Sequence, residues 1–78
     1  MRYFFNVQDG DVIPDLFGTD LADDEAAKAE ALSSFAEMAG DLGRKFWDGG
    51  EWQMNVQDET GRKVLTLRFS GEISAALA

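Results

Sequence analysis

The chain has 78 residues, of which 15 are acidic and 7 basic, so its net charge is −8 at pH 7. A chain of this length holds at most one hydrophobic core, and we expect a single α+β domain spanning residues 1–78. So negative a protein repels phosphate backbones, which disfavours direct binding of nucleic acid. Histidine, the commonest general base and transition-metal ligand, is absent.

The chain also lacks cysteine, which suits a reducing compartment. No apolar run approaches the length of a membrane span, and the opening residues 1–5 do not resemble a signal peptide. We therefore expect a cytoplasmic protein with no membrane partner.

Residues 2–8 predict a β-strand, because aromatic and β-branched residues alternate with other side chains. Asp9-Gly10 predicts a tight hairpin turn, and Asp11–Ile13 a short returning strand. Pro14 has no N–H to donate, so that strand should lie at an edge of a sheet or end there. Asp15–Asp20 predicts a turn-rich loop.

Residues 23–46 predict the one long helix, with Asp23 as its N-cap. Arg44 and Lys45 should lie in its last turn, and Gly49-Gly50 should end it. Apolar residues recur at spacings of three and four along one face of this helix, which we expect to pack on the sheet: Leu32, Phe35, Ala39, Leu42 and Phe46.

Residues 51–69 predict a second hairpin, with a turn at Asp58–Gly61 and a returning strand at Lys63–Phe69. The order β-β-α-β-β predicts an α+β fold, in which an antiparallel sheet of about four strands has one long helix packed on one face. The other face of the sheet should be rich in amides, with Phe4 as its prominent aromatic side chain.

No set of residues amounts to a catalytic site, so we expect no enzymatic activity, no cofactor and no metal. Asp9, Asp11 and Asp15 offer oxygen ligands, but they lack the further oxygens, glycine and glutamate of a calcium loop. Solvated turn carboxylates are the simpler interpretation.

The acidic residues are concentrated in the opening third, where seven of them and no basic residue lie between Tyr3 and Ala27. We expect this surface to bind a basic protein or nucleoprotein complex that handles nucleic acid, because complementary charge steers association. The expected contact residues are Asp9, Asp11, Asp15, Asp20, Asp23, Asp24 and Glu25, with Glu30 and Glu37 at the margin. The alternative is that the charge serves only solubility.

The sequence is also compatible with a homodimer, in which the partner is a second copy of the chain. It would form through the open sheet face at Phe4 and Val64, or by edge pairing along the strand before Pro14 or along the last predicted strand.

Short motifs spread over nearly the whole chain resemble one known family: Arg2-Tyr3-Phe4-Phe5, Asp9-Gly10, Pro14-Asp15, Gly18, Leu21, Trp52–Val56, Asp58-Glu59, Gly61 and Val64–Leu67. That family consists of small uncharacterised proteins, frequent in rhizobia and related alphaproteobacteria, and described as a domain of unknown function. The resemblance implies the α+β fold and a bacterial source, and it implies no activity. The first loop is more acidic here than is usual in the family, which suits a phage-borne or repurposed copy.

Two weaker resemblances bear on function. Residues 2–39 are similar in their order of elements to the antitoxin half of HicA–HicB pairs, which implies the covering of a small basic RNA-cleaving toxin. A small acidic protein without a catalytic site also resembles anti-CRISPR inhibitors, which implies a nucleic-acid mimic that blocks a basic groove. An anti-CRISPR-type inhibitor is the sharpest prediction, with a HicB-like antitoxin and a bacterial housekeeping protein as alternatives.

Overall fold

The structure is a computed structural model that describes residues 1–9, 11–48 and 51–74. The predicted turn at Gly10 and the predicted helix stop at Gly49-Gly50 therefore lie outside the described residues. The elements, in chain order, are β1 (Arg2–Gln8), β2 (Val12–Ile13), β3 (Thr19–Asp20), α1 (Asp24–Leu42), α2 (Lys45–Asp48), β4 (Glu51–Asp58) and β5 (Lys63–Ser70). None of the described helices is long and apolar enough to cross a bilayer.

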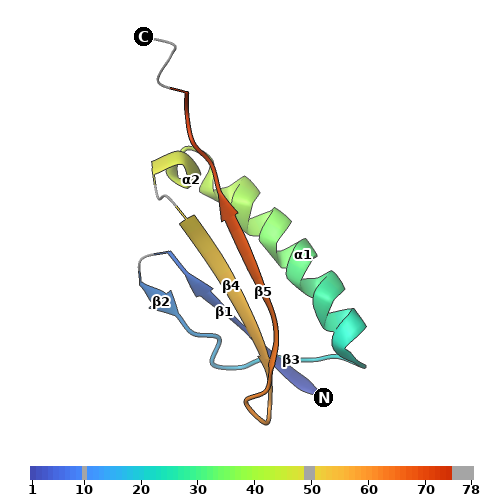
Figure 1. The fold of residues 1–78 in the computed structure, drawn as a ribbon. Helices are drawn as coiled ribbons and strands as arrows, with labels where there is room; N and C mark the ends of the chain where they lie inside the picture. The colour runs from blue at the N-terminus through green and yellow to red at the C-terminus, as the bar shows by residue number, and fades with distance from the viewer. Residues whose placement is uncertain (10, 49–50, 75–78) are drawn as a thin grey trace.

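The strands form one antiparallel sheet in the order β2-β1-β4-β5, and β3 pairs with the opposite end of β1 from β2. The helix α1 lies along one face of this sheet (Figure 1). Val7, Met54 and Leu67 lie side by side across β1, β4 and β5. Because directly opposite residues point to the same face, the predicted apolar alternation supplies one face of the sheet. The predicted α+β architecture is confirmed.

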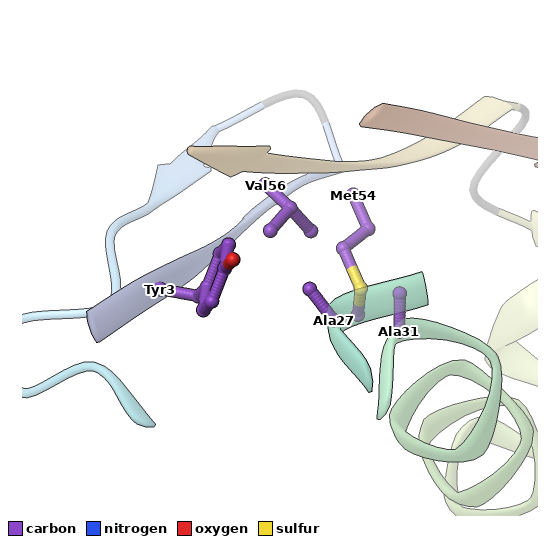
Figure 2. Close-up of a cluster of buried hydrophobic side chains, with 5 residues drawn as sticks. All are labelled: Tyr3, Ala27, Ala31, Met54 and Val56. Carbon is purple, nitrogen blue, oxygen red and sulfur yellow. The ribbon is translucent and has the colours of Figure 1, made fainter. Parts of the chain in front are cut away.

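The core lies between that sheet face and the first half of α1. Tyr3, Met54 and Val56 reach from the sheet towards Ala27 and Ala31 of the helix, and all five are buried (Figure 2). The two alanines place almost no side chain between the helix backbone and the sheet, so α1 can approach closely over the bulky residues of β1 and β4. The bulk of the core thus comes from the strands.

The predicted apolar stripe of the helix is partly wrong. Ala27 and Ala31 form the buried centre of the helix face, whereas Leu32 is 60% exposed. Phe35 is half-buried and meets Phe69 of β5 edge to face. The predicted stripe therefore faces β5, and the side of α1 that carries Ala27 and Ala31 faces the centre of the sheet. The large strand residues leave room only for small side chains at that centre.

The predicted helix is also too long. α1 ends at Leu42, and Gly43 follows with a φ of 52°, a conformation that favours glycine. Phe46 consequently belongs to the short α2, where it stacks on Phe69. Arg44 and Lys45 lie beyond the last turn of α1, which holds no basic residue.

Candidate functional site

Residues 11–20, hereafter the edge segment, run along the outer side of β1 (Figure 1). β2 pairs with one end of β1 and β3 with the other, and no other described strand pairs with the middle of β1 on this side. Three of the nine predicted contact residues lie in this segment, and each has a different environment: Asp11, Asp15 and Asp20.

Asp15 fills the gap in the ladder with its side chain. Its Oδ2 accepts a hydrogen bond from the N–H of Phe5 (3.1 Å), and its Oδ1 accepts from the N–H groups of Phe17 (3.2 Å) and Gly18 (3.0 Å). Its own N–H donates to Oδ1 of Asn6 (2.8 Å). Partial burial acts to raise the pKa of Asp15, but these backbone donors outweigh it and lower the pKa. Asp15 therefore has a structural role in holding the edge segment on β1.

Replacing Asp15 by alanine should destabilise the fold by about 1–3 kcal/mol, because three backbone N–H groups lose their acceptor. Urea unfolding at neutral pH measures the effect. Asp11→Ala is the matched control, since this exposed carboxylate should change the free energy of unfolding by less than about 0.5 kcal/mol. Equal stabilities of the two variants would contradict the bridging role.

Asp20 of the edge segment and two further predicted contact residues, Asp23 and Glu25, have local partners. Asp20 receives both Nε and Nη2 of Arg2 at 3.2 Å. Asp23 caps α1, because its Oδ1 accepts from the N–H of Ala26 at 2.9 Å, as predicted. Glu25 pairs with Lys28 one turn further along the helix at 2.8 Å. These exposed pairs add little stability, but they neutralise part of the expected negative surface.

Asp24 connects the helix to the sheet. Its Oδ1 accepts from Oη of Tyr3 (2.8 Å), and Nη2 of Arg62 donates to both of its oxygens (2.9 and 3.0 Å). The hydrogen bonds from Tyr3 and Arg62 lower the pKa of Asp24, whereas burial and the bond to Asp24 raise the pKa of Tyr3. Asp24 is thus engaged in joining β1, α1 and the residue that precedes β5.

Asp58 completes this network, and sequence patterning did not single it out. The residue is only 2% exposed. Oδ1 accepts from the N–H (2.9 Å) and Oγ1 (2.6 Å) of Thr60 and from the N–H of Arg62 (3.1 Å), while Oδ2 accepts from Nε of Arg62 (3.0 Å). The hydroxyl of Thr60, followed by these backbone donors, lowers the pKa of Asp58 to about 2. The sequence did hold a local indication of this role, because the side chain of an aspartate at the start of a turn often accepts a hydrogen bond from the backbone N–H two residues later.

The remaining predicted contact residues fall into two places. Asp11 is the first residue of the edge segment, and Asp9 precedes it by two residues. Glu30 and Glu37 lie on the flank of α1 that faces away from β5, opposite Phe35. That flank borders an open groove of about 540 Å³, lined by Ser34, Glu37, Met38, Asp41, Leu42 and Lys45. The nine residues therefore do not form one continuous acidic patch.

The edge segment also exposes apolar side chains that sequence patterning did not predict as a surface. Phe17 is 80% exposed and Leu16 77%, and Val12 and Ile13 of β2 are also exposed. Val12 and Ile13 are adjacent in β2, so their side chains point to opposite faces of the sheet. We call these four exposed residues of the edge segment the apolar cluster. Asp11 directly precedes it in the chain, and large exposed apolar groups bordered by charge are typical of protein–protein contact sites.

Within the described ranges, no three acidic side chains converge in a way that could hold a metal ion. The carboxylates of Asp15 and Asp24 face backbone N–H groups and a guanidinium, and Asp58 is enclosed by its own turn. These three carboxylates are therefore engaged within the fold.

The whole of this framework lies within one family domain. A family model described as "Domain of unknown function (DUF6894)" matches residues 2–70. The chain belongs to this family. No curated protein and no solved structure matches the chain. The DUF6894 match begins with the first residue of β1 and ends with the last residue of β5, so α1 and the edge segment lie inside it. The resemblance to a domain family of unknown function is confirmed.

Proposed function

We propose that the protein is a non-enzymatic binding protein that docks its edge segment on a basic protein that handles nucleic acid. The observation that carries this proposal is that the apolar cluster lies close in the chain to Asp9 and Asp11, two carboxylates that form no salt bridge with any residue that the structure describes. Phe17 and Leu16 would supply the buried centre of the contact, and the carboxylates its charged rim.

Only some of the predicted acidic contact residues are free of a structural role, so the proposed contact surface is smaller than the predicted one. Asp15, Asp23 and Asp24 make bonds that support the fold, so their replacement would disturb structure as well as binding. Asp9 and Asp11 remain available to meet lysine and arginine side chains of a partner. A charged rim of this kind raises the rate of association and orients the two proteins. Its electrostatic attraction weakens as the salt concentration rises.

We propose the bacterial cytoplasm as the place of this encounter, because complexes that handle nucleic acid lie there. Inhibition of an anti-CRISPR type, in which the acidic edge occupies a groove built for phosphates, is the narrowest form of the proposed function. A HicB-like role would give a small basic toxin as the partner, so the identity of the bound protein separates these two forms.

The test is capture of partners from a lysate of the native host on the immobilised protein. We expect basic nucleic-acid-handling proteins to bind at about 0.05 M salt and to fall away at about 0.5 M. The variants Asp9→Lys/Asp11→Lys and Phe17→Ser should each lose these proteins, with a loss for Phe17→Ser of about 2 kcal/mol or more.

The charge-matched control is Asp41→Lys/Glu72→Lys, which makes the same change in net charge at exposed positions outside the edge segment. This control should retain the captured proteins. Circular dichroism should show the same folded spectrum for every variant. Identical capture by the wild type and by both edge-segment variants would exclude the proposed surface.

A further inference from the structure

The strand β5 is an uncovered edge of the sheet. It spans eight residues, and among the described residues its only strand partner is β4 (Figure 1). The opposite edge is treated differently, since β2, β3 and the side chain of Asp15 occupy the outer side of β1. A long edge strand with free backbone groups is a template for pairing with another strand.

The flank of α1 above this edge is apolar. Leu32, Phe35, Leu67 and Phe69 line an open pocket of about 230 Å³ together with Arg68. The exposed Leu32 is the residue by which the apolar face of the helix extends beyond the sheet. The helix thus presents more apolar surface than this sheet can cover, and the excess lies directly beside the free edge.

We propose that a second copy of this chain pairs with β5 in antiparallel orientation, with Leu67 on the two-fold axis. In this register Leu67 lies opposite Leu67 of the second copy, and Leu65 lies opposite Phe69. All of these side chains point to the helix-bearing face, so the joined sheet keeps one apolar face. A shift by one residue would oppose apolar and polar faces, and a register centred on Thr66 would place Lys63 opposite Phe69.

The backbone geometry agrees with this register. The N–H of Phe5 points away from β4 towards Asp15, so Phe5 does not exchange hydrogen bonds with its neighbour Val56. By the alternation of antiparallel ladders, Val56 bonds to Leu65 instead, which leaves the backbone groups of Thr66 and Arg68 directed outwards. Thr66 and Arg68 are the residues that the proposed register places opposite each other.

The helices also fit. α1 contacts both β4 and β5, so it lies over the side of the sheet that ends in the free edge. Rotation about the two-fold axis, which is perpendicular to the joined sheet, places the two helices on the same face of that sheet, one on each side of the axis. Leu32 lines the same pocket as Leu67, so the two copies of Leu32 would meet near the axis.

The charges favour this edge over the others. β5 carries Lys63 and Arg68 and no acidic residue. The edge segment, with its carboxylates, lies at the far side of the sheet, and Glu37 lies on the other flank of α1. Two copies with a net charge of −8 therefore approach with least repulsion along β5. Added salt should not weaken this association, in contrast to binding of a basic partner.

The first test is the oligomeric state by sedimentation velocity. The wild type should be a dimer at micromolar concentrations or above in moderate salt, and Leu32→Glu should weaken dimerisation at least tenfold, because it places two carboxylates in the apolar contact. The matched control is Leu16→Glu, at another exposed leucine, which lies in the edge segment, and this variant should dimerise like the wild type. A monomeric wild type, or equal dimerisation of the two variants, would overturn the proposed interface.

A second test reads the register and does not depend on Leu32. The chain has no cysteine, so Thr66→Cys and Arg68→Cys each introduce the single thiol of their chain at an exposed position. On mild oxidation a mixture of the two variants should give mainly the mixed disulfide, since opposite residues of a strand pair lie within disulfide reach. Preferential disulfides between two Thr66→Cys chains would show a register centred on Thr66 and contradict the one proposed.

Discussion

Asp58→Ala should be among the most destabilising single substitutions in this protein. The carboxylate is buried and satisfies the backbone N–H groups of Thr60 and Arg62, the hydroxyl of Thr60 and the guanidinium of Arg62. Its removal leaves these donors without acceptors and frees Arg62 from one of its two carboxylates. We expect the midpoint of thermal unfolding to fall by about 10 °C or more.

The pH dependence of stability provides the check on this result. The folded-state pKa of Asp58 is lowered to about 2, from an ordinary value of about 3.9, so its ionised form stabilises the fold. That stabilisation is fully present above about pH 5 and is lost as the pH falls through about 4 towards 2. The difference in urea midpoint between the wild type and Asp58→Ala should therefore shrink over this range. Asp41→Ala, at an exposed helix position, should show almost no difference at any pH, and a constant gap for Asp58→Ala would contradict its ionic role.

Met54→Ala should cost about 2–5 kcal/mol of unfolding free energy, because it opens a cavity at the centre of the core. Met54 is buried between Val7 and Leu67 of the neighbouring strands and faces Ala31 of the helix (Figure 2). Neither alanine of α1 can move far enough to fill the space, since the helix backbone already lies close to the sheet. Chemical denaturation monitored by tryptophan fluorescence measures this change.

Leu32→Ala is the matched control for the core, measured at a concentration where the wild type is monomeric. Periodicity places Leu32 in the predicted stripe, whereas the structure leaves most of its side chain in solvent. We expect a change of about 0.5 kcal/mol or less. Similar losses for Leu32→Ala and Met54→Ala would mean that the helix packs on the sheet as periodicity alone predicted.

Local chemistry explains which parts of the fold could be predicted. The alternation in residues 2–8 and 51–69 defines strands because side chains of a strand point to opposite faces in turn. Asp23 could be identified as the N-cap because capping involves only its own helix. The rotation of α1 on the sheet could not be predicted, since periodicity finds the apolar arc of a helix but not the size of the residues that it will meet.

The same distinction applies to the candidate site. The excess of acidic residues before Ala27 is visible in the sequence, and it predicts a partner-binding surface that includes residues of the edge segment. Their individual environments depend on contacts between distant residues, such as Asp24 with Arg62, for which no local pattern exists. The exposure of Phe17 could not be predicted either, because an aromatic residue in a turn-rich loop is equally compatible with a buried position in the core.

The pairing of β1 with β4 has a consequence for the order of events during translation. Tyr3 lies opposite Asp58, so β1 can pair with β4 only after all the residues between these two strands have been synthesised. Until then only the short ladders of β2 and β3 can form beside it. Such dependence on residues far apart in sequence slows folding. In a nascent chain halted before β4, the aromatic side chains of β1 would therefore lack the strand with which they form the core.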